Sequence, residues 1–320
     1  MSLKSPSDNA DPAASEFLVL SSIENFYIGG QTRDVQTGTF GLQTQVRGQM
    51  YVEHYGPAGR SFPVPLIFIH GAVHTGAVWG TTPDGREGWR NIFLREGFDC
   101  YLVDQPWRGR SAPDLSALNP TLGQSEIAPE AVTCGLQVVD FFVRGGTRFP
   151  LEAKRDYAAQ FWPDFGLPAA ARDGRLGLSD PRSLPPLLDL IDRLGTAILI
   201  VHSQAAHIGW LAALERPKSI LAIHAIEPAL TIPGLDDPRF PDIPVRITWG
   251  DHLDETADIL NLNDVRIAKS IAAERANVEL DWLPEAGITG NGHMLMMEDN
   301  NVELAQRSID WLRSLRLDVD

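Results

Sequence analysis

The chain has 320 residues, of which 43% are hydrophobic and 22% charged, and its formal net charge is −15. This length suits one large α/β domain or a core domain with an insertion, and the composition permits a substantial buried core. The acidic balance disfavours nucleic-acid and membrane-surface partners, because an acidic surface repels phosphate backbones and anionic lipids. No apolar run reaches the roughly 18 residues that a membrane span needs.

The first fifteen residues, MSLKSPSDNADPAAS, predict a flexible tail. They are polar, contain two prolines and lack the apolar segment of a signal peptide. We therefore expect a cytoplasmic protein, or a periplasmic or secreted one if a signal peptide has been removed. The two cysteines, Cys100 and Cys134, make no disulfide framework. We expect two buried free thiols, with a bridge between them as the alternative.

Strand-like runs recur along the chain, and helical patterns separate most of the later ones. The first two runs, FLVL near residue 18 and the run at 43–55, alternate in part and suit an antiparallel edge. The later runs are rich in Ile, Leu and Val, as expected for central strands covered on both faces, and lie at 65–70, 98–104, 197–202, 220–226, 245–249 and 278–283. Helical patterns occupy 88–97, 205–217, 263–277 and 301–316. This alternation predicts βαβ units and a mainly parallel sheet.

One interval breaks the alternation. Some ninety residues lie between Asp104 and Ala197, far more than one crossover needs. We predict a core over 16–111 and 191–320, and a core helix plus a helical cap insertion over 112–190. The interval contains an aromatic cluster that could line a pocket: Phe141, Phe142, Phe149, Tyr157, Phe161, Trp162 and Phe165. The alternative is surface decoration with no role in binding.

Ser203 stands between the strand-like run 197–202 and a helix-like segment rich in alanine. It could be a helix N-cap, because serine caps helices well. It could also be a nucleophile on a tight strand-to-helix turn, which favours small residues two positions before and after the serine. Ala205 fits that rule and Val201 does not, so the serine alone leaves both interpretations open.

The run FIHGAVHTG at 68–76 supports the nucleophile. A strand that ends in His-Gly can build half of an oxyanion hole, in which backbone N–H groups stabilise the negative charge of an acyl-transfer transition state. We assign one donor to the amide of Ala72 and the other to the amide of Gln204. An ordinary strand-to-loop turn is the alternative.

His293 is the best candidate for the base. It lies in a glycine-bearing loop after the last predicted strand and before the terminal helix, the position that the chain order serine, acid, histidine requires. The competing histidines are His54, His70, His74, His202, His207, His224 and His252.

Three carboxylates compete to orient this histidine. Glu227 ends the run 220–226 before Pro228, whereas Asp251 and Asp254 follow the next strand-like run. Strand position alone favours Asp251 or Asp254. Because the spacing around them matches no metal-binding template, we expect no metal and no cofactor.

Six segments in this order resemble a small family of bacterial α/β-hydrolase carboxylesterases. They are the HG at 70–71, TTPDGREGW at 81–89, DQPWRGRSAPD at 104–114, HSQ at 202–204, IEP at 226–228 and GNGHM at 290–294. The resemblance runs from about residue 40 to the C-terminus. It implies the α/β-hydrolase fold, with an eight-stranded, mainly parallel sheet flanked by helices and a helical cap.

The resemblance also implies a triad of Ser203, His293 and Glu227, which reverses the choice made from strand position. It implies secretion signals and homodimers as well. Where the family has two adjacent, disulfide-bonded cysteines in the oxyanion loop, this chain has Ala72 and Val73. The favoured function is therefore a serine hydrolase that cleaves small-molecule carboxylic esters through an acyl-enzyme.

Other functions remain open at this point. Lactones or amides could be cleaved by the same triad, because the triad does not select the leaving group. A non-hydrolytic lyase could use the same fold with the serine and histidine as acid and base only. A third possibility is a binding module without catalysis, although such a protein has no reason to keep all three groups.

Overall fold

The computed structural model describes residues 17–37, 41–113, 139–140, 142–143, 146–162, 181–229, 234–253 and 262–317. Within them, eight strands form one sheet in the order β1-β2-β4-β3-β5-β6-β7-β8. The strands are β1 Leu20–Thr37, β2 Gly41–Pro57, β3 Leu66–Ile69, β4 Cys100–Asp104, β5 Ala197–His202, β6 Ile220–Ile226, β7 Val245–Trp249 and β8 Val278–Trp282. The helices are α1 Trp89–Arg95, α5 Lys154–Ala158, α7 Leu184–Leu194, α8 Ala205–Glu215, α9 Leu262–Glu274 and α10 Asn301–Ser314.

The sheet is parallel from β4 to β8 and antiparallel at its other edge, where β1 pairs with β2 and β2 pairs with β4. This confirms the predicted mainly parallel sheet with an antiparallel edge. The runs predicted at 197–202, 220–226 and 245–249 match β5, β6 and β7 at both ends. They match because these strands are buried along nearly their whole length and therefore consist mostly of apolar residues.

Helices cover both faces of the sheet, and the sheet separates the hydrophobic core into two clusters. Alternate side chains of β3 point to opposite faces. Leu66 and Phe68 pack in the cluster that contains α1 and α10, whereas Ile67 and Ile69 pack in the cluster that contains α7, α8 and α9. None of the helices in the described part of the chain is both long and apolar enough to cross a membrane.

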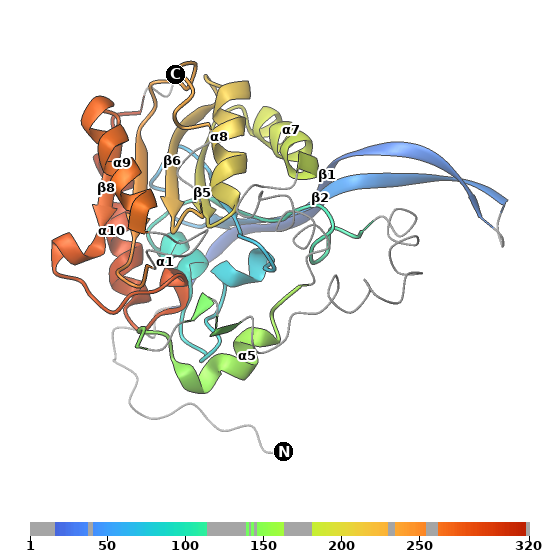
Figure 1. Cartoon of the computed structure of the whole chain (residues 1–320). Helices are drawn as coiled ribbons and strands as arrows, with labels where there is room; N and C mark the ends of the chain where they lie inside the picture. Colours follow the sequence, from blue (N-terminus) through green and yellow to red (C-terminus); the bar gives the residue numbers. More distant parts are fainter. Residues whose placement is uncertain are drawn as a thin grey trace.

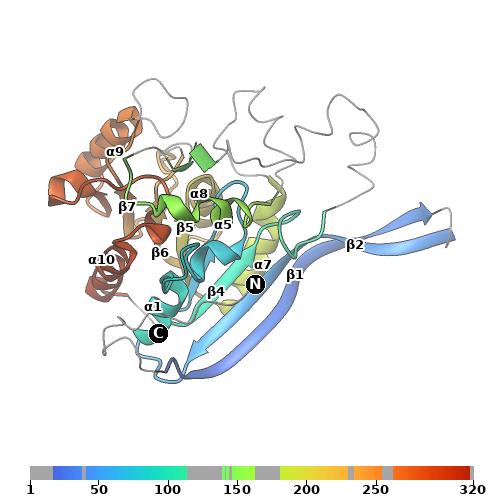
Figure 2. The same ribbon diagram turned by 90° about the horizontal axis from the view of Figure 1, so that it is seen from below.

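The first hairpin is far longer than the sequence predicted. We expected a short strand near residue 18, but β1 begins at Leu20 and pairs with β2 as far as Thr37 and Gly41. Figures 1 and 2 show both strands running together away from the body of the molecule. The outer part was missed because its residues, such as TRDVQT, show no apolar alternation.

Most of the predicted insertion at 112–190 lies outside the described residues, so the cap stays a prediction. Phe141, Phe165 and Cys134 fall there. Helix α7 begins at Leu184, within the predicted insertion, and packs its apolar face against the sheet core through Leu187, Leu190 and Ile191. Cys100 is a buried free cysteine, as expected, and burial raises the pKa of its thiol well above the usual range.

Candidate active site

Ser203 lies on a strained turn between β5 and α8. Its φ of 55° falls in the left-handed region, which a residue with a side chain rarely adopts. The turn is held on both sides, because the Ser203 amide donates to the Ile226 carbonyl at 3.0 Å and the Ala206 amide donates to the Ser203 carbonyl at 3.0 Å. A Cβ on Gly71 would lie 2.8 Å from the Ser203 Cβ, so only glycine fits beside the serine.

A glycine in helix α8 makes room for the β-branched side chain of Val201. Val201 is fully buried on β5 and faces Gly209 of α8, where an added Cβ would lie 3.2 Å from a Val201 methyl group. The close approach of strand and helix at the serine turn therefore depends on a glycine in the helix, not on a small residue in the strand.

His293 and Glu227 form a buried pair beside this turn. Nδ1 of His293 lies 3.3 Å from Oε2 of Glu227, and the two side chains are 3% and 2% exposed. An ionised carboxylate can only accept, so the ring donates its Nδ1–H to Glu227. The other carboxylate oxygen, Oε1, accepts the Gly250 amide at 2.5 Å. Glu227 itself has a φ of 47°, a second strained position at the end of a strand.

Asp251 has a different role from the one that strand position favoured. Its Oδ2 accepts the Gly290 amide at 2.9 Å, and its own amide donates to the Asn291 carbonyl at 3.1 Å. Asp251 therefore braces the loop that carries His293, while Glu227 contacts the histidine ring. Asp254, the other alternative, lies outside the described residues.

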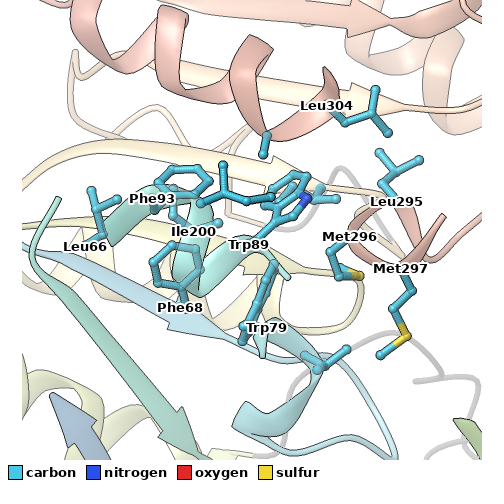
Figure 3. Packing of buried hydrophobic residues seen from close by; sticks show 14 of the residues in the cluster. Leu66, Phe68, Trp79, Trp89, Phe93, Ile200, Leu295, Met296, Met297 and Leu304 are labelled. Carbon is cyan, nitrogen blue, oxygen red and sulfur yellow. The ribbon is translucent and has the colours of Figure 1, made fainter. Parts of the chain in front are cut away.

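The histidine loop is anchored on its far side by an apolar segment. Leu295, Met296 and Met297 are buried in the core cluster, and Figure 3 shows them beside Trp79 and Trp89. The Nε1–H of Trp89 donates to the Asn301 carbonyl at 3.0 Å, which ties α1 to the start of α10. This packing fixes the backbone that follows His293.

Glu298 is a buried carboxylate beneath the same loop. It accepts the Gly292 amide at 2.6 Å and the Asn291 side-chain amide at 2.6 Å. Burial raises the pKa of Glu298 to about 8, and the negative charge of Glu227 acts in the same direction. The buried roles of Glu298 and Asn291 were not predicted from the sequence. Their only signal is that they are polar residues flanking an apolar run, which does not reveal burial.

His202 supports His293 without contacting Glu227. Its Nε2–H donates to the backbone carbonyl of His293 at 2.9 Å, and the two ring centroids lie 4.7 Å apart. Burial lowers the pKa of His202 well below its usual range, so the ring is neutral. His224 is a buried residue of β6; its Nε2 lies 2.9 Å from the Thr248 hydroxyl, and burial lowers its pKa to about 3.

Segments from the predicted insertion hold the loop that contains Ala72. Nδ1–H of His74 donates to the Ala72 carbonyl at 2.6 Å, while Nε2 of His74 accepts the Tyr157 hydroxyl at 2.8 Å. The Val73 carbonyl accepts the Trp162 amide at 2.8 Å, and Val73 has a φ of 55°. The described aromatic residues of the insertion thus pack directly on the candidate oxyanion loop.

Phe142 extends this aromatic layer to the base. Its ring stacks on His293 with centroids 5.7 Å apart and also meets His74 at 5.2 Å. Gln204, the other assigned oxyanion donor, immediately precedes α8, whose N-terminal amides favour negative charge. The structure therefore brings Ser203, His293, Glu227, Ala72 and Gln204 to one edge of the sheet, where β3, β5 and β6 end.

Two comparisons place this chain among known proteins. A solved bacterial esterase superposes with a TM-score of 0.81 at 30% sequence identity, and the match covers 93% of this chain and 97% of that one. The "Probable secreted lipase phiG" of a fungal species (strain ATCC 74256) is 28% identical over 90% of this chain and 88% of its own length. No protein-family model matches the chain. With this sheet and this degree of identity, the chain belongs to the α/β-hydrolase family of that bacterial esterase.

Proposed function

We propose that this chain is a serine hydrolase that cleaves carboxylic esters through an acyl-enzyme. The observation that carries the proposal is the strained turn of Ser203 beside the buried His293–Glu227 pair. A serine hydroxyl is a weak nucleophile until a base takes its proton, and this arrangement supplies both the base and its orienting acid. The names of the esterase and lipase relatives support the same reaction class.

In the proposed reaction, Oγ of Ser203 attacks the ester carbonyl carbon and its proton passes to His293. The tetrahedral intermediate then loses the alcohol, which takes that proton from His293. Water attacks the acyl-enzyme in the same way, and Ser203 regains its proton. Glu227 holds the ring of His293 in one orientation and stabilises its charged form.

The negative charge on the carbonyl oxygen would be held by the amides of Ala72 and Gln204. Each such donor is worth roughly 3 kcal/mol in a hydrolase of this kind. The hydrogen bonds to the Ala72 and Val73 carbonyls support this assignment, because they restrain the loop before substrate arrives. The aromatic layer of Phe142, Tyr157 and Phe161 favours an apolar acyl or alcohol group beside the site.

Turnover of a chromogenic ester, such as a p-nitrophenyl ester, tests the proposal. We expect hydrolysis together with covalent labelling of Ser203 by a fluorophosphonate probe. A lyase would turn over without needing a covalent serine, and a binding module would show no turnover. Matched lactone and amide substrates measure how far the same triad extends beyond esters.

The compartment and the oligomeric state stay predictions. The relative named as a secreted lipase favours a secreted protein. The predicted homodimer would suit β1, which is the outermost strand of the sheet in the described part of the chain, since an edge strand is a common pairing site. Cell fractionation and sedimentation of the purified protein test these two predictions.

A further inference from the structure

Arg108 is a buried cation that the proposed reaction has not used. It lies in the loop after β4 and is only 4% exposed. One guanidinium nitrogen, Nη1, donates to the Gly71 carbonyl at 3.3 Å, and Nη2 donates to Oε1 of Gln204 at 3.2 Å. A single side chain thus bridges the loop after β3 and the start of α8, the two segments that carry the proposed oxyanion donors.

The contact with Gly71 acts on the peptide group that carries the Ala72 amide. A trans peptide is planar, so its carbonyl and its N–H point in opposite directions. Fixing the Gly71 carbonyl therefore fixes the direction of the Ala72 N–H. His70 adds a second donor, because its Nδ1 lies 2.8 Å from the same carbonyl while its Nε2 accepts the Gln105 amide at 3.1 Å.

The charge of Arg108 strengthens this effect. A guanidinium stays protonated in proteins, and a hydrogen bond from a charged donor is stronger than a neutral one. Donation to the carbonyl also polarises the peptide, which makes its N–H a better donor on the other side. The second contact holds the side chain of Gln204, whose own amide is the other donor.

We propose that Arg108 is a positioning residue for the oxyanion hole: it aligns the Ala72 and Gln204 amides and places a positive charge behind them. The inference rests on the proposed function. It predicts that loss of Arg108 weakens the binding of the tetrahedral transition state and leaves the binding of the ground-state ester nearly unchanged.

The test compares Arg108→Met and Arg108→Lys with Arg246→Met. Arg246 is a matched control because it is also buried, at 7% exposed, but pairs with Asp281 at 2.6 Å near the start of β7, away from the ends of β3 and β5. We expect kcat to fall about 100-fold in Arg108→Met, as for loss of one oxyanion donor, with little change in KM. Arg108→Lys should fall less, because it keeps the charge but cannot bridge both acceptors. In Arg246→Met, kcat per folded molecule should stay near wild type.

An alkylboronic acid separates positioning from a folding role, because it forms a tetrahedral adduct with the active serine. Its Ki should rise about as much as kcat/KM falls in each Arg108 variant. A loss of activity that follows only the folded fraction, with Ki unchanged, would overturn the inference. So would a rise in KM confined to anionic esters, since that would make Arg108 a substrate-binding residue.

A crystal structure of Arg108→Met adds a readout that does not depend on turnover. We expect the Gly71–Ala72 peptide to rotate or to occupy two orientations. An unmoved peptide would overturn the positioning role even in an active esterase. Conversely, a wild-type protein that hydrolyses no ester would end the proposed function whatever this peptide does, so the two failures are distinguishable.

Discussion

The sheet holds two buried histidine–carboxylate pairs, one at each end of its parallel strands. At the carboxyl end, His293 meets Glu227 at 3.3 Å. At the amino end, His54 meets Asp99 at 2.6 Å, with both side chains 11% exposed and the ring stacked on Tyr101. By distance alone, the second pair is the better hydrogen bond, yet among the described residues no non-glycine residue with a positive φ lies beside it.

The difference between the pairs lies in their surroundings. Among the described residues, the non-glycine positions with positive φ are Val73, Trp107, Ser203 and Glu227. All of them lie in loops that follow β3, β4, β5 and β6, at the end that holds His293. Backbone strain of this kind persists only where neighbouring structure enforces it. A histidine–carboxylate pair therefore becomes a candidate catalytic pair through the loops around it, not through its own geometry.

Removing the nucleophile is the most direct test of the difference between the two pairs. Ser203→Ala should lower kcat by about a million-fold, because the remaining hole and binding contacts cannot replace a lost nucleophile. Thermal stability should change little. The measurement is ester turnover beside a melting curve, and a variant that keeps a tenth of wild-type kcat would show that Ser203 is not the nucleophile.

Replacing the acid tests the carboxyl-end pair itself. Glu227→Gln should lower kcat on the order of 10⁴-fold, since the ring loses its orienting acceptor and its charge support. Asp251→Asn and Asp254→Asn should cost far less, and Asp251→Asn should act through the loop of Gly290. The three kcat values, taken on one ester at one pH, decide between the candidates. If Asp251→Asn loses most of its kcat and Glu227→Gln does not, then Asp251 orients the histidine, as strand position alone predicted.

The buried carboxyl group of Glu298, beneath the His293 loop, predicts a pH dependence of the unfolding free energy. Burial raises its pKa to about 8 in the fold, against an ordinary value of 4.5, so unfolding releases its proton between those pH values. Stability should therefore fall as pH rises from about 4.5 to about 8, by on the order of 5 kcal/mol in total. Glu298→Gln should remove this dependence, whereas Glu303→Gln, at an exposed position on α10, should keep it. Denaturant unfolding at pH 5 and pH 9 measures the difference; parallel pH slopes in wild type and Glu298→Gln would contradict the prediction.

The amino-end pair supplies the matched control. Asp99→Asn removes the nearer of the two carboxylates beside His54 and weakens the contact to Arg60, whose Nη1 lies 3.5 Å from Asp99. We expect a loss of about 2 kcal/mol in unfolding free energy, with kcat within about twofold of wild type. Chemical unfolding and initial rates check the two parts separately. A large loss of kcat in a folded variant would mean that the two ends of the sheet are coupled.

The smallest expected effect concerns metals. The proposed charge stabilisation comes from backbone amides and one arginine, so exhaustive dialysis against a chelator should leave the rate unchanged. If the rate falls sharply after dialysis and recovers when zinc or magnesium is added, the proposed roles of both the serine and the acid are wrong.

The sequence predicted the parts of the fold whose burial is uniform. Strands β5, β6 and β7 are buried along nearly their whole length, so their mostly apolar runs mark their ends. The outer hairpin was missed and the bounds of α7 were not predicted, for different reasons. The hairpin pairs polar residues through its backbone, and α7 begins with two prolines after Leu184, a composition that also suits a loop.

At the site, the sequence predicted the residues whose chain position is diagnostic. Ser203 and His293 each follow a strand end at a recognisable point. Glu227 was chosen only through the family resemblance, because chain order does not distinguish it from Asp251. Arg108 and Glu298 could not be found from the sequence, since their roles depend on which carbonyls and amides the fold brings to them.

The long hairpin has a consequence for any measurement of stability. Beyond Gly30, β1 and β2 pair mainly with each other, and most of their side chains there are exposed. A two-stranded ribbon without a packed face is marginally stable in water, whereas β5 lies at the centre of the core. Hydrogen bonds thus run across the whole sheet, but the outer ribbon and the body of the molecule do not unfold as one cooperative unit. Its outer ribbon can fray and re-form many times within the lifetime of one folded molecule, and a single unfolding free energy describes only the body.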